Sequence, residues 1–436
     1  MSERQRIAVI GAGIAGLSAA WLLSQRYSVV LFEAAERLGG HTHTVPVELE
    51  GKTYPVDTGF LVFNPNTYPN LIALFAQLGV ESVETEMSFS VSLEQPAVEW
   101  AGSSLTTLFA QKRNLTRPPF WAMLADIVRF NRASIAWLAN GTERSDSLRE
   151  FLAAGRYSRA FTEWYLLPMA AAIWSCPSGQ MLDFPAATLI RFCQNHGLLQ
   201  IFDRPLWRTV KGGGIEYVRR IAADVSDIRL ACPVQAVTRE ASGGLRVVHT
   251  GGAEHFDQVV LACHSDQALA LLGASASEAQ RATLSAIRYQ PNRAVLHTDP
   301  ALLPRDRAVW SAWNYWAGSG QPDQRPVSVS YLINRLQPLP FATPVVVTLN
   351  PAREPAARQR LAEFEYAHPV LDGPAIAAGQ QLNAIQGESG IWLCGAWTGY
   401  GFHEDGLKSA LGVANALGVR APWQAAQAVN PAPVGG

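Results

Sequence analysis

The sequence predicts an α/β fold in which a dinucleotide-type βαβ unit is combined with a second, inserted portion of α+β structure. Three observations predict it. A strand, a glycine-rich turn, a helix and a second strand follow one another over residues 6–33. Helical patterns dominate residues 96–200, and short strand-like runs separated by glycine turns fill residues 211–263. A chain of 436 residues is long enough for two connected domains with a sizeable core.

Composition restricts the class of partner. Hydrophobic residues make up 48% of the chain and charged residues 16%, whereas about 25% charged residues is typical. The net charge of -1 lacks the basic excess of a nucleic-acid-binding protein. We therefore expect an apolar surface or a large apolar cavity, a small apolar partner and no nucleic acid.

The N-terminus and the cysteines indicate an intracellular protein. The first apolar run is short and follows two arginines, so we expect no signal peptide, and no run approaches the length of about 18 apolar residues of a membrane span. We expect a soluble cytoplasmic protein. The five cysteines have no CxxC spacing, and we expect free buried thiols and no metal site: Cys176, Cys193, Cys232, Cys263 and Cys394.

The glycine-rich turn at residues 11–16 has the GxGxxG pattern and lies between a predicted strand, 6–10, and a predicted helix, 14–26. The first glycine permits a tight turn, the second a close approach of pyrophosphate, and the third close packing of helix and strand. The next strand, 28–33, ends in a carboxylate that can accept from ribose hydroxyls. The predicted cofactor contacts are Gly11, Gly13, Ala15, Gly16 and Glu33.

Together with Arg37-Leu38-Gly39-Gly40, these residues resemble the N-terminal signature of the flavin-containing amine oxidase and phytoene desaturase superfamily. The resemblance implies FAD rather than NAD. It also implies a Rossmann-like FAD-binding domain of the GR2 type with an inserted α+β substrate domain, as in flavin amine oxidases. The further cofactor contacts that it implies are Arg37, Gly39, Gly40, Thr58 and Gly59.

The pattern predicts a helix at 71–78 and, farther along, a helical cap over residues 96–200 with helices at 119–139, 151–173 and 186–194. A basic stretch with aromatic neighbours precedes the second of these helices: Phe109, Lys112, Arg113 and Arg117. Two interpretations stay open, packing in the core and a peripheral contact at the inner face of the membrane.

The strand-rich part that follows suggests the domain boundaries. By the resemblance, a β-meander returns the chain to the FAD domain and Val234 meets the adenine. The predicted FAD-binding domain comprises residues 1–95, 200–285 and 385–420, and the substrate domain comprises 96–199 and 286–384. The low-complexity tail, 421–436, is predicted to be mobile.

A second glycine- and aromatic-rich motif near the C-terminus resembles the segment that completes the FAD site in the superfamily. The implied contacts are Gly395, Trp397, Asp405, Gly406 and Leu407, and a helix opening at Asp405 is expected to point its N–H groups at flavin N1 and C2=O. His403 is expected near the ring. His41 and His43 stand near the flavin by the family pattern, which leaves covalent attachment open.

The expected chemistry departs from that of amine oxidases. Those enzymes typically use a lysine in the substrate sheet, but the four lysines of this chain are Lys52, Lys112, Lys211 and Lys408, so none lies between residues 212 and 407. Aromatic and amide side chains occupy this part instead and suit a long apolar substrate. The candidate catalytic residues are His403, Tyr315, Asn314 and Tyr331.

Three functions are weighed. The preferred one is an FAD-dependent oxidoreductase that desaturates a lipid or fatty-acyl chain by hydride transfer to flavin N5, with His403 or Tyr315 as the base. The alternatives are a flavin amine oxidase acting on an apolar amine and a non-catalytic flavin-binding or assembly protein. The chain resembles a bacterial branch of predicted NAD/FAD-binding, amine-oxidase-like proteins. That branch is often encoded near cyclopropane-fatty-acid-synthase-like methyltransferases, which implies lipid chemistry.

Overall fold

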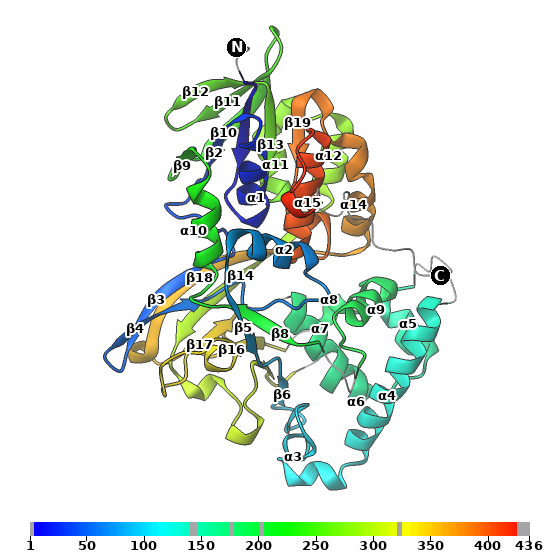
Figure 1. The fold of residues 1–436 in the computed structure, drawn as a ribbon. Helices are drawn as coiled ribbons and strands as arrows, with labels where there is room; N and C mark the ends of the chain where they lie inside the picture. Colours follow the sequence, from blue (N-terminus) through cyan, green and yellow to red (C-terminus); the bar gives the residue numbers. More distant parts are fainter. Residues whose placement is uncertain (1–3, 140–145, 175–177, 201–204, 321–324, 425–436) are drawn as a thin grey trace, which may run out of the picture.

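The computed structural model describes residues 4–139, 146–174, 178–200, 205–320 and 325–424. Two sheets organise these residues, one at each end of the molecule (Figure 1). The predicted tail from residue 425 and Cys176 lie outside the described residues. In the described part, Cys193, Cys232, Cys263 and Cys394 are free thiols, as predicted, and Cys193 and Cys394 are buried.

The first sheet is parallel and has five strands from four distant parts of the chain. Its order is β19-β13-β1-β2-β9, and the strands are β1 (Arg6–Ile10), β2 (Ser28–Phe32), β9 (Asp227–Arg229), β13 (Gln258–Leu261) and β19 (Ile391–Leu393). The carboxyl ends of β1, β2 and β13 therefore lie at one edge, where an open α/β sheet binds its ligand.

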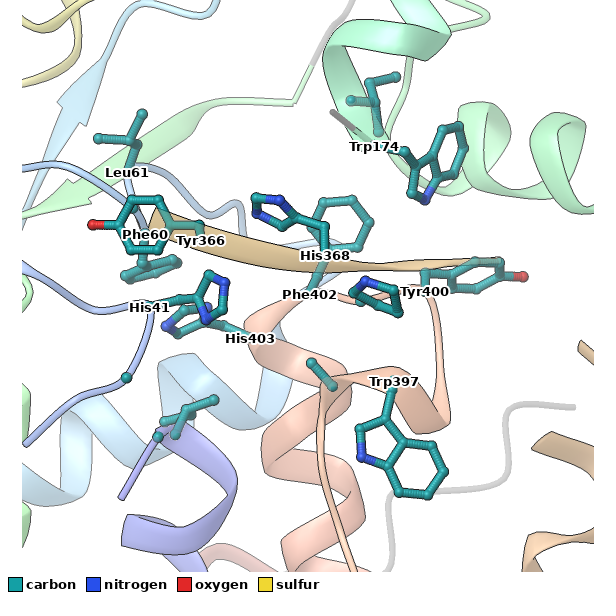
Figure 2. Close-up of a pocket in the computed structure, with 18 of the residues that line it drawn as sticks. His41, Phe60, Leu61, Trp174, Tyr366, His368, Trp397, Tyr400, Phe402 and His403 are labelled. Atoms are coloured by element: carbon teal, nitrogen blue, oxygen red, sulfur yellow. The ribbon is translucent and has the colours of Figure 1, made fainter. Parts of the chain in front are cut away.

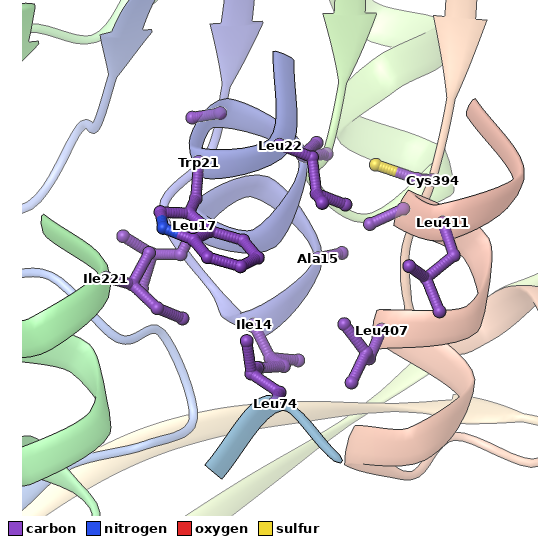
Figure 3. Packing of buried hydrophobic residues seen from close by; sticks show 14 of the residues in the cluster. Ile14, Ala15, Leu17, Trp21, Leu22, Leu74, Ile221, Cys394, Leu407 and Leu411 are labelled. Atoms are coloured by element: carbon purple, nitrogen blue, oxygen red, sulfur yellow. The ribbon is translucent and has the colours of Figure 1, made fainter. Parts of the chain in front are cut away.

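Helix α1 (Ile14–Leu23) packs on one face of this sheet. Every residue of α1 is buried because helices cover it on several sides, namely α15 (His403–Ala416), α10 (Ile215–Ala223) and α2 (Pro69–Leu78) (Figure 3). A helix that is apolar all round requires such an environment. Gly16 permits it, since a Cβ built there would lie 1.8 Å from the carbonyl oxygen of Gly11.

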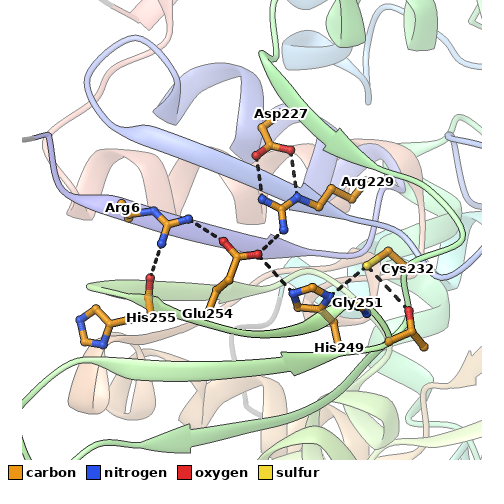
Figure 4. A network of polar contacts seen from close by, with 9 residues as sticks. Arg6, Asp227, Arg229, Cys232, His249, Gly251, Glu254 and His255 are labelled. Carbon is orange, nitrogen blue, oxygen red and sulfur yellow. Dashed lines mark hydrogen bonds and ion pairs between the residues drawn. The ribbon is translucent and has the colours of Figure 1, made fainter.

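The opposite face carries a three-stranded antiparallel meander and three helices. These are β10 (Val234–Arg239), β11 (Leu245–His249), β12 (Gly252–Phe256), α11 (Ser265–Leu272), α12 (Glu278–Ser285) and α14 (Gly373–Ile385). A polar network ties the meander to the parallel sheet, because Glu254 accepts from Arg6 at 2.8 Å and also pairs with Arg229 (Figure 4). Arg229 and Arg6 lower the pKa of Glu254 to about 2.

The second sheet has seven strands in the order β18-β14-β17-β16-β15-β6-β7, and all neighbours are antiparallel except β15 and β6. The strands are β6 (Phe89–Leu93), β7 (Val98–Ala101), β14 (Arg288–His297), β15 (Trp313–Ala317), β16 (Val327–Leu332), β17 (Val346–Leu349) and β18 (Arg360–Val370). Two small pairs accompany it: β3 (Thr44–Leu49) with β4 (Lys52–Asp57), and β5 (Ser82–Thr85) with β8 (Trp207–Val210).

A helical layer flanks the second sheet (Figure 1). It contains α3 (Leu105–Leu108), α4 (Pro118–Ala139), α5 (Leu148–Ala154), α6 (Arg159–Phe161), α7 (Leu167–Trp174), α8 (Ser178–Met181) and α9 (Ala186–Asn195), and the short α13 (Ile333–Leu336) follows β16. The predicted helices at 71–78, 119–139 and 186–194 are confirmed within two residues at their ends, whereas the predicted helix 151–173 is divided between several short ones.

Two contacts cross the domain boundaries proposed from the sequence. Strand β6 lies within the segment 1–95 that the sequence assigned to the FAD domain, but it pairs with β15 in the second sheet. Helix α14 lies within the segment 286–384 assigned to the substrate domain, but its buried residues pack in the core beneath the parallel sheet. Strand pairing and helix packing between distant residues decide with which sheet β6 and α14 associate. The local sequence pattern carries no information about such contacts.

Candidate functional site

A cavity of about 1060 Å³ extends from the edge of the parallel sheet to the seven-stranded sheet (Figure 2). Ligand sites usually measure about 300 to 1,000 Å³. The cavity is therefore large enough for a dinucleotide and part of a second ligand. Its two ends differ in chemistry.

The end at the parallel sheet has the geometry of a dinucleotide site. Gly11 has φ +101°, and a Cβ there would lie 2.9 Å from the carbonyl oxygen of Ala262. Gly13 has an ordinary φ of -73° and no protein atom within 4 Å of a Cβ built on it. Neither backbone strain nor contact with protein atoms requires a glycine at this position. Gly13 lines the cavity at the start of α1, and no side chain caps this helix. The free N–H groups and the helix dipole fit a pyrophosphate at this point.

Glu33 lies beside this loop. Its carboxylate accepts from the backbone N–H groups of Ala12 at 2.7 Å and Ala35 at 2.9 Å, and each oxygen keeps a lone pair for a ribose hydroxyl. Val234 and Cys232 line the same end of the cavity. These residues fit the adenosine part of FAD.

Most of the cofactor residues expected from the sequence line the cavity. Those that do are Gly11, Gly13, Ala15, Glu33, Gly39, Gly40, Thr58, Gly59, Val234, Gly395 and Trp397. Those that do not are Gly16, Arg37, Asp405, Gly406 and Leu407. Arg37 is half-buried beside the carbonyl oxygens of Leu38 and Thr42, and burial lowers its pKa.

In the C-terminal motif, α15 begins at His403, two residues before Asp405, where the helix was expected to open. Asp405 accepts from the backbone N–H groups of Tyr400 at 3.1 Å and Phe402 at 3.0 Å, and burial raises its pKa to about 6. A Cβ at Gly406 would lie 2.9 Å from Ile14, and Leu407 is fully buried. This triplet therefore holds α15 against α1, and His403 is the residue of the helix start that borders the cavity.

His403 is held rigidly. Its ring stacks on Phe60 at a centroid distance of 3.8 Å, and its Nε2 lies 2.8 Å from the hydroxyl of Thr42 (Figure 2). Burial lowers the pKa of His403 to about 3, so the imidazole is neutral and a weak base. This geometry favours a role in positioning over the predicted role as general base.

Three further histidines gather at the cavity beside Tyr366. The ring of His41 lies 5.2 Å from that of His368 and 6.0 Å from that of His264. Burial lowers the pKa of all three, to about 4 for His368. Asn292 donates to Nδ1 of His368 at 2.8 Å, so the neutral ring presents an N–H at Nε2.

His41 also carries a polar atom without a protein partner, since its buried Nε2 makes no hydrogen bond within the described structure. It can therefore bond to a group of the bound flavin or substrate. His43 contacts the hydroxyl of Tyr366 at 3.2 Å and does not line the cavity. The sequence analysis missed His264, His368 and Tyr366, although the alternation of Phe364, Tyr366 and His368 along one strand could have indicated a shared face.

The end of the cavity at the seven-stranded sheet is apolar. Its lining includes Phe89, Trp100, Tyr165, Met169, Ile173, Trp174, Phe192, Leu198, Trp207, Trp313, Tyr331 and Leu349. No lysine or arginine is among the described residues that line the cavity, and its two acidic residues are Glu33 and Glu86. Glu86 forms an ion pair with Arg335, whose guanidinium lies 2.6 Å from the carboxylate.

Two of the four predicted catalytic residues lie elsewhere. Asn314 does not line the cavity, because its amide donates to the carbonyl oxygens of Ser311 at 2.6 Å and Ser330 at 3.0 Å. Tyr315 is 1% exposed within the core of the seven-stranded sheet. Tyr331 and His403 do line the cavity. Periodicity alone could not separate the residues of β15 that face the cavity from those that pack behind it.

Within the described residues, no three histidine, cysteine, aspartate or glutamate side chains are arranged to hold a metal ion. In the same part of the chain, no helix combines the length and apolar character needed to cross a membrane.

Comparison with known proteins gives a family and a fold. Residues 14–333 match a family described as flavin containing amine oxidoreductase. A carotenoid phi-ring synthase of Streptomyces griseus is 29% identical over 68% of this chain and 62% of its own length, so the match spans less than two thirds of that relative.

Two solved structures share the fold. The CLA-producing fatty acid isomerase from P. acnes is 15% identical over 94% of this chain and 98% of that one, with a TM-score of 0.65. Cyclohexylamine oxidase from Brevibacterium oxydans IH-35A is 16% identical over 95% and 100%, also with a TM-score of 0.65.

Proposed function

The chain belongs to the flavin containing amine oxidoreductase family and binds FAD, and from this premise we propose that it is an FAD-dependent oxidoreductase acting on an apolar substrate. The proposed substrate is a lipid or fatty-acyl chain, and the proposed reaction is desaturation of a C–C bond. We also propose that the protein works in the cytoplasm and meets this substrate at the inner face of the membrane.

The observation that carries the proposal is the apolar end of the cavity. Mostly aromatic and aliphatic side chains line it, and among the described residues the one carboxylate at that end, Glu86, is already paired with Arg335. A charged substrate would lose its hydration there without gaining an ionic partner. A hydrocarbon chain gains from burial, at about 0.8 kcal/mol for each CH₂ group. The similarity to a carotenoid phi-ring synthase is in line with such a substrate.

FAD, when bound, supplies an acceptor for a hydride from a substrate carbon. The chain itself orients the reaction: Gly13 and the start of α1 hold the phosphates, and His368 presents an N–H to the cavity. The second hydrogen leaves the neighbouring carbon as a proton. We assign its acceptance to water, which carries it to solvent, because Nε2 of His368 already bears the ring proton and Nε2 of His403 is engaged by the hydroxyl of Thr42.

The test is anaerobic mixing of the flavin-loaded protein with fractionated bacterial lipids, followed by the flavin absorbance. Bleaching by a lipid fraction, together with a product lighter by two hydrogens, is the expected result. Bleaching by no lipid fraction would refute the lipid substrate.

A second function, oxidation of an apolar amine, is favoured by the aromatic residues Trp397 and Tyr400 at the cavity, because aromatic faces attract cations. The family description and the shared fold of cyclohexylamine oxidase are in line with it. Bleaching by members of an amine panel, with release of peroxide in air, would select this function over desaturation.

The third function is a flavin carrier or assembly protein without turnover. Fast bleaching by either the lipid fractions or the amine panel excludes it. A flavin that neither set of compounds reduces would favour it.

A further inference from the structure

A basic segment, which we define as residues 102–125, forms the end of the molecule farthest from the parallel sheet. It comprises α3, the following short 3-10 helix (Lys112–Thr116) and the start of α4 (Figure 1). Three of its large apolar side chains face solvent: Leu105 is 76% exposed, and Leu115 and Trp121 are each 50% exposed. Their exposure is costly in water unless something covers them.

The exposed indole is held in place. Nε1 of Trp121 donates to the carbonyl oxygen of Leu115 at 2.9 Å, and its ring lies 5.4 Å from that of Phe109. The indole is therefore fixed before binding, so a contact through it requires little ordering of this side chain.

The charge of the basic segment has one sign. It contains Lys112, Arg113 and Arg117 and no aspartate or glutamate. The guanidinium groups of Arg113 and Arg117 converge on one carbonyl oxygen, that of Ala97, at 2.6 and 3.1 Å. No carboxylate of the described residues forms an ion pair with these three cations, whereas Arg293 of β14 and Arg335 of α13 are each paired with a glutamate. The basic segment therefore favours an anionic partner.

The cavity reaches the surface beside the basic segment. Gly102 and Ser103, the first two residues of the basic segment, are exposed and line the cavity. Phe89 and Trp100, from the adjoining strands, continue the lining inward. If an apolar partner surface covered Leu105, an apolar molecule could pass from that surface into the cavity with little exposure to water.

We propose that the basic segment docks the protein on an anionic lipid bilayer, with Leu105, Leu115 and Trp121 inserted at the interface and the cavity mouth against the bilayer. Basic residues beside exposed aromatic and aliphatic groups are the combination that binds anionic bilayers. The inference rests on the proposed function for the direction of substrate entry, but the docking itself can be tested separately.

The test is co-sedimentation of the flavin-loaded protein with two kinds of vesicle, phosphatidylcholine alone and equal parts phosphatidylcholine and phosphatidylglycerol. We expect binding to the anionic vesicles that weakens as salt is raised, and little binding to the neutral ones. The double variant Leu105→Asp with Lys112→Glu is expected to weaken binding at least roughly tenfold.

A matched control is available at the opposite edge of the same sheet. The pair Leu361→Asp with Arg358→Glu changes one exposed leucine and one exposed cation beside β18. We expect wild-type binding from this control and an unchanged flavin spectrum and melting temperature from both double variants.

The proposal would be overturned if the wild type bound neither kind of vesicle or bound both equally. It would also be overturned if the control variant lost as much vesicle binding as the Leu105→Asp, Lys112→Glu variant. Self-association of the wild type that the Leu105→Asp, Lys112→Glu variant abolishes would overturn it as well, by assigning the surface to a second copy. Flavin bleaching by lipid without vesicle binding refutes the docking alone, and vesicle binding without bleaching refutes the proposed function alone.

Discussion

Replacement of Gly13 by alanine separates the cofactor role of this residue from its role in folding. The backbone of Gly13 suits alanine, with φ -73°, and the added methyl group meets no protein atom within 4 Å. Alanine restricts the unfolded chain but is a poorer residue at a helix N-cap, and these opposing effects leave the stability of the apoprotein within about 1 kcal/mol of wild type.

The same methyl group projects into the space that we assign to the pyrophosphate. Loss of one hydrogen bond to a charged group costs about 1.5–3 kcal/mol, so FAD affinity should fall roughly ten- to a hundredfold. Fluorescence titration of the apoprotein with FAD measures this loss. Thermal unfolding with and without FAD provides a second readout, because a ligand at free concentration c that binds only the folded state stabilises it by RT ln(1 + c/Kd), which falls as Kd rises.

Two other glycines serve as controls. Gly16→Ala places its Cβ 1.8 Å from the carbonyl oxygen of Gly11 and should destabilise the fold itself by about 3 kcal/mol or more. Gly412→Ala, inside α15 with no atom within 4 Å of the new Cβ, should stabilise it by about 0.5–1 kcal/mol and leave FAD binding unchanged. Wild-type FAD affinity in Gly13→Ala would refute the pyrophosphate placement, and an unfolded Gly13→Ala would refute the inference of free space.

Two further predictions concern the start of α15. The folded-state pKa of His403 is lowered from 6.5 to about 3, so its contribution to stability is complete above pH 6.5 and is lost as the pH falls toward 3. His403→Phe should therefore flatten the decline in the free energy of unfolding between pH 6.5 and 4, by up to about 1.4 kcal/mol per pH unit in urea titrations; an unchanged slope would contradict the neutral, buried imidazole. Buried Glu404 accepts from the N–H groups of Asn70 and Leu71 at the start of α2. Glu404→Ala should cost about 2 kcal/mol and Glu404→Gln less, because the amide keeps one acceptor; equal losses in a melting comparison would contradict this role.

Local signals in the sequence account for much of the dinucleotide-binding half. The strand 6–10 is found at the predicted residues, and the helix after it begins at Ile14 as predicted. Such a unit is readable because its glycines, its strand and its helix lie within about 30 residues of each other. The three glycines of residues 11–16 also have the distinct environments that the pattern implies.

The remaining features depended on contacts between distant residues. The Asp405-Gly406-Leu407 motif stays a predicted flavin contact, and only the structure shows that Gly406 also packs closely against Ile14 of another helix. Asn314 looked catalytic, but the carbonyl oxygens of Ser311 and Ser330 engage its amide. A polar residue has the same local pattern whether it faces a cavity or satisfies a backbone group behind it.

The sequence by itself determined that this chain carries a dinucleotide-binding βαβ unit, a flavin-type glycine signature and no lysine between residues 212 and 407. Those are properties of residue type and short spacing. Only the tertiary structure decided that His41, His264 and His368 meet at one cavity, that Glu404 caps a helix more than 300 residues earlier, and that the cavity opens beside the basic segment. The physical reason is that strand pairing and helix packing bring together residues from distant parts of the chain, and spacing along the sequence does not encode that proximity.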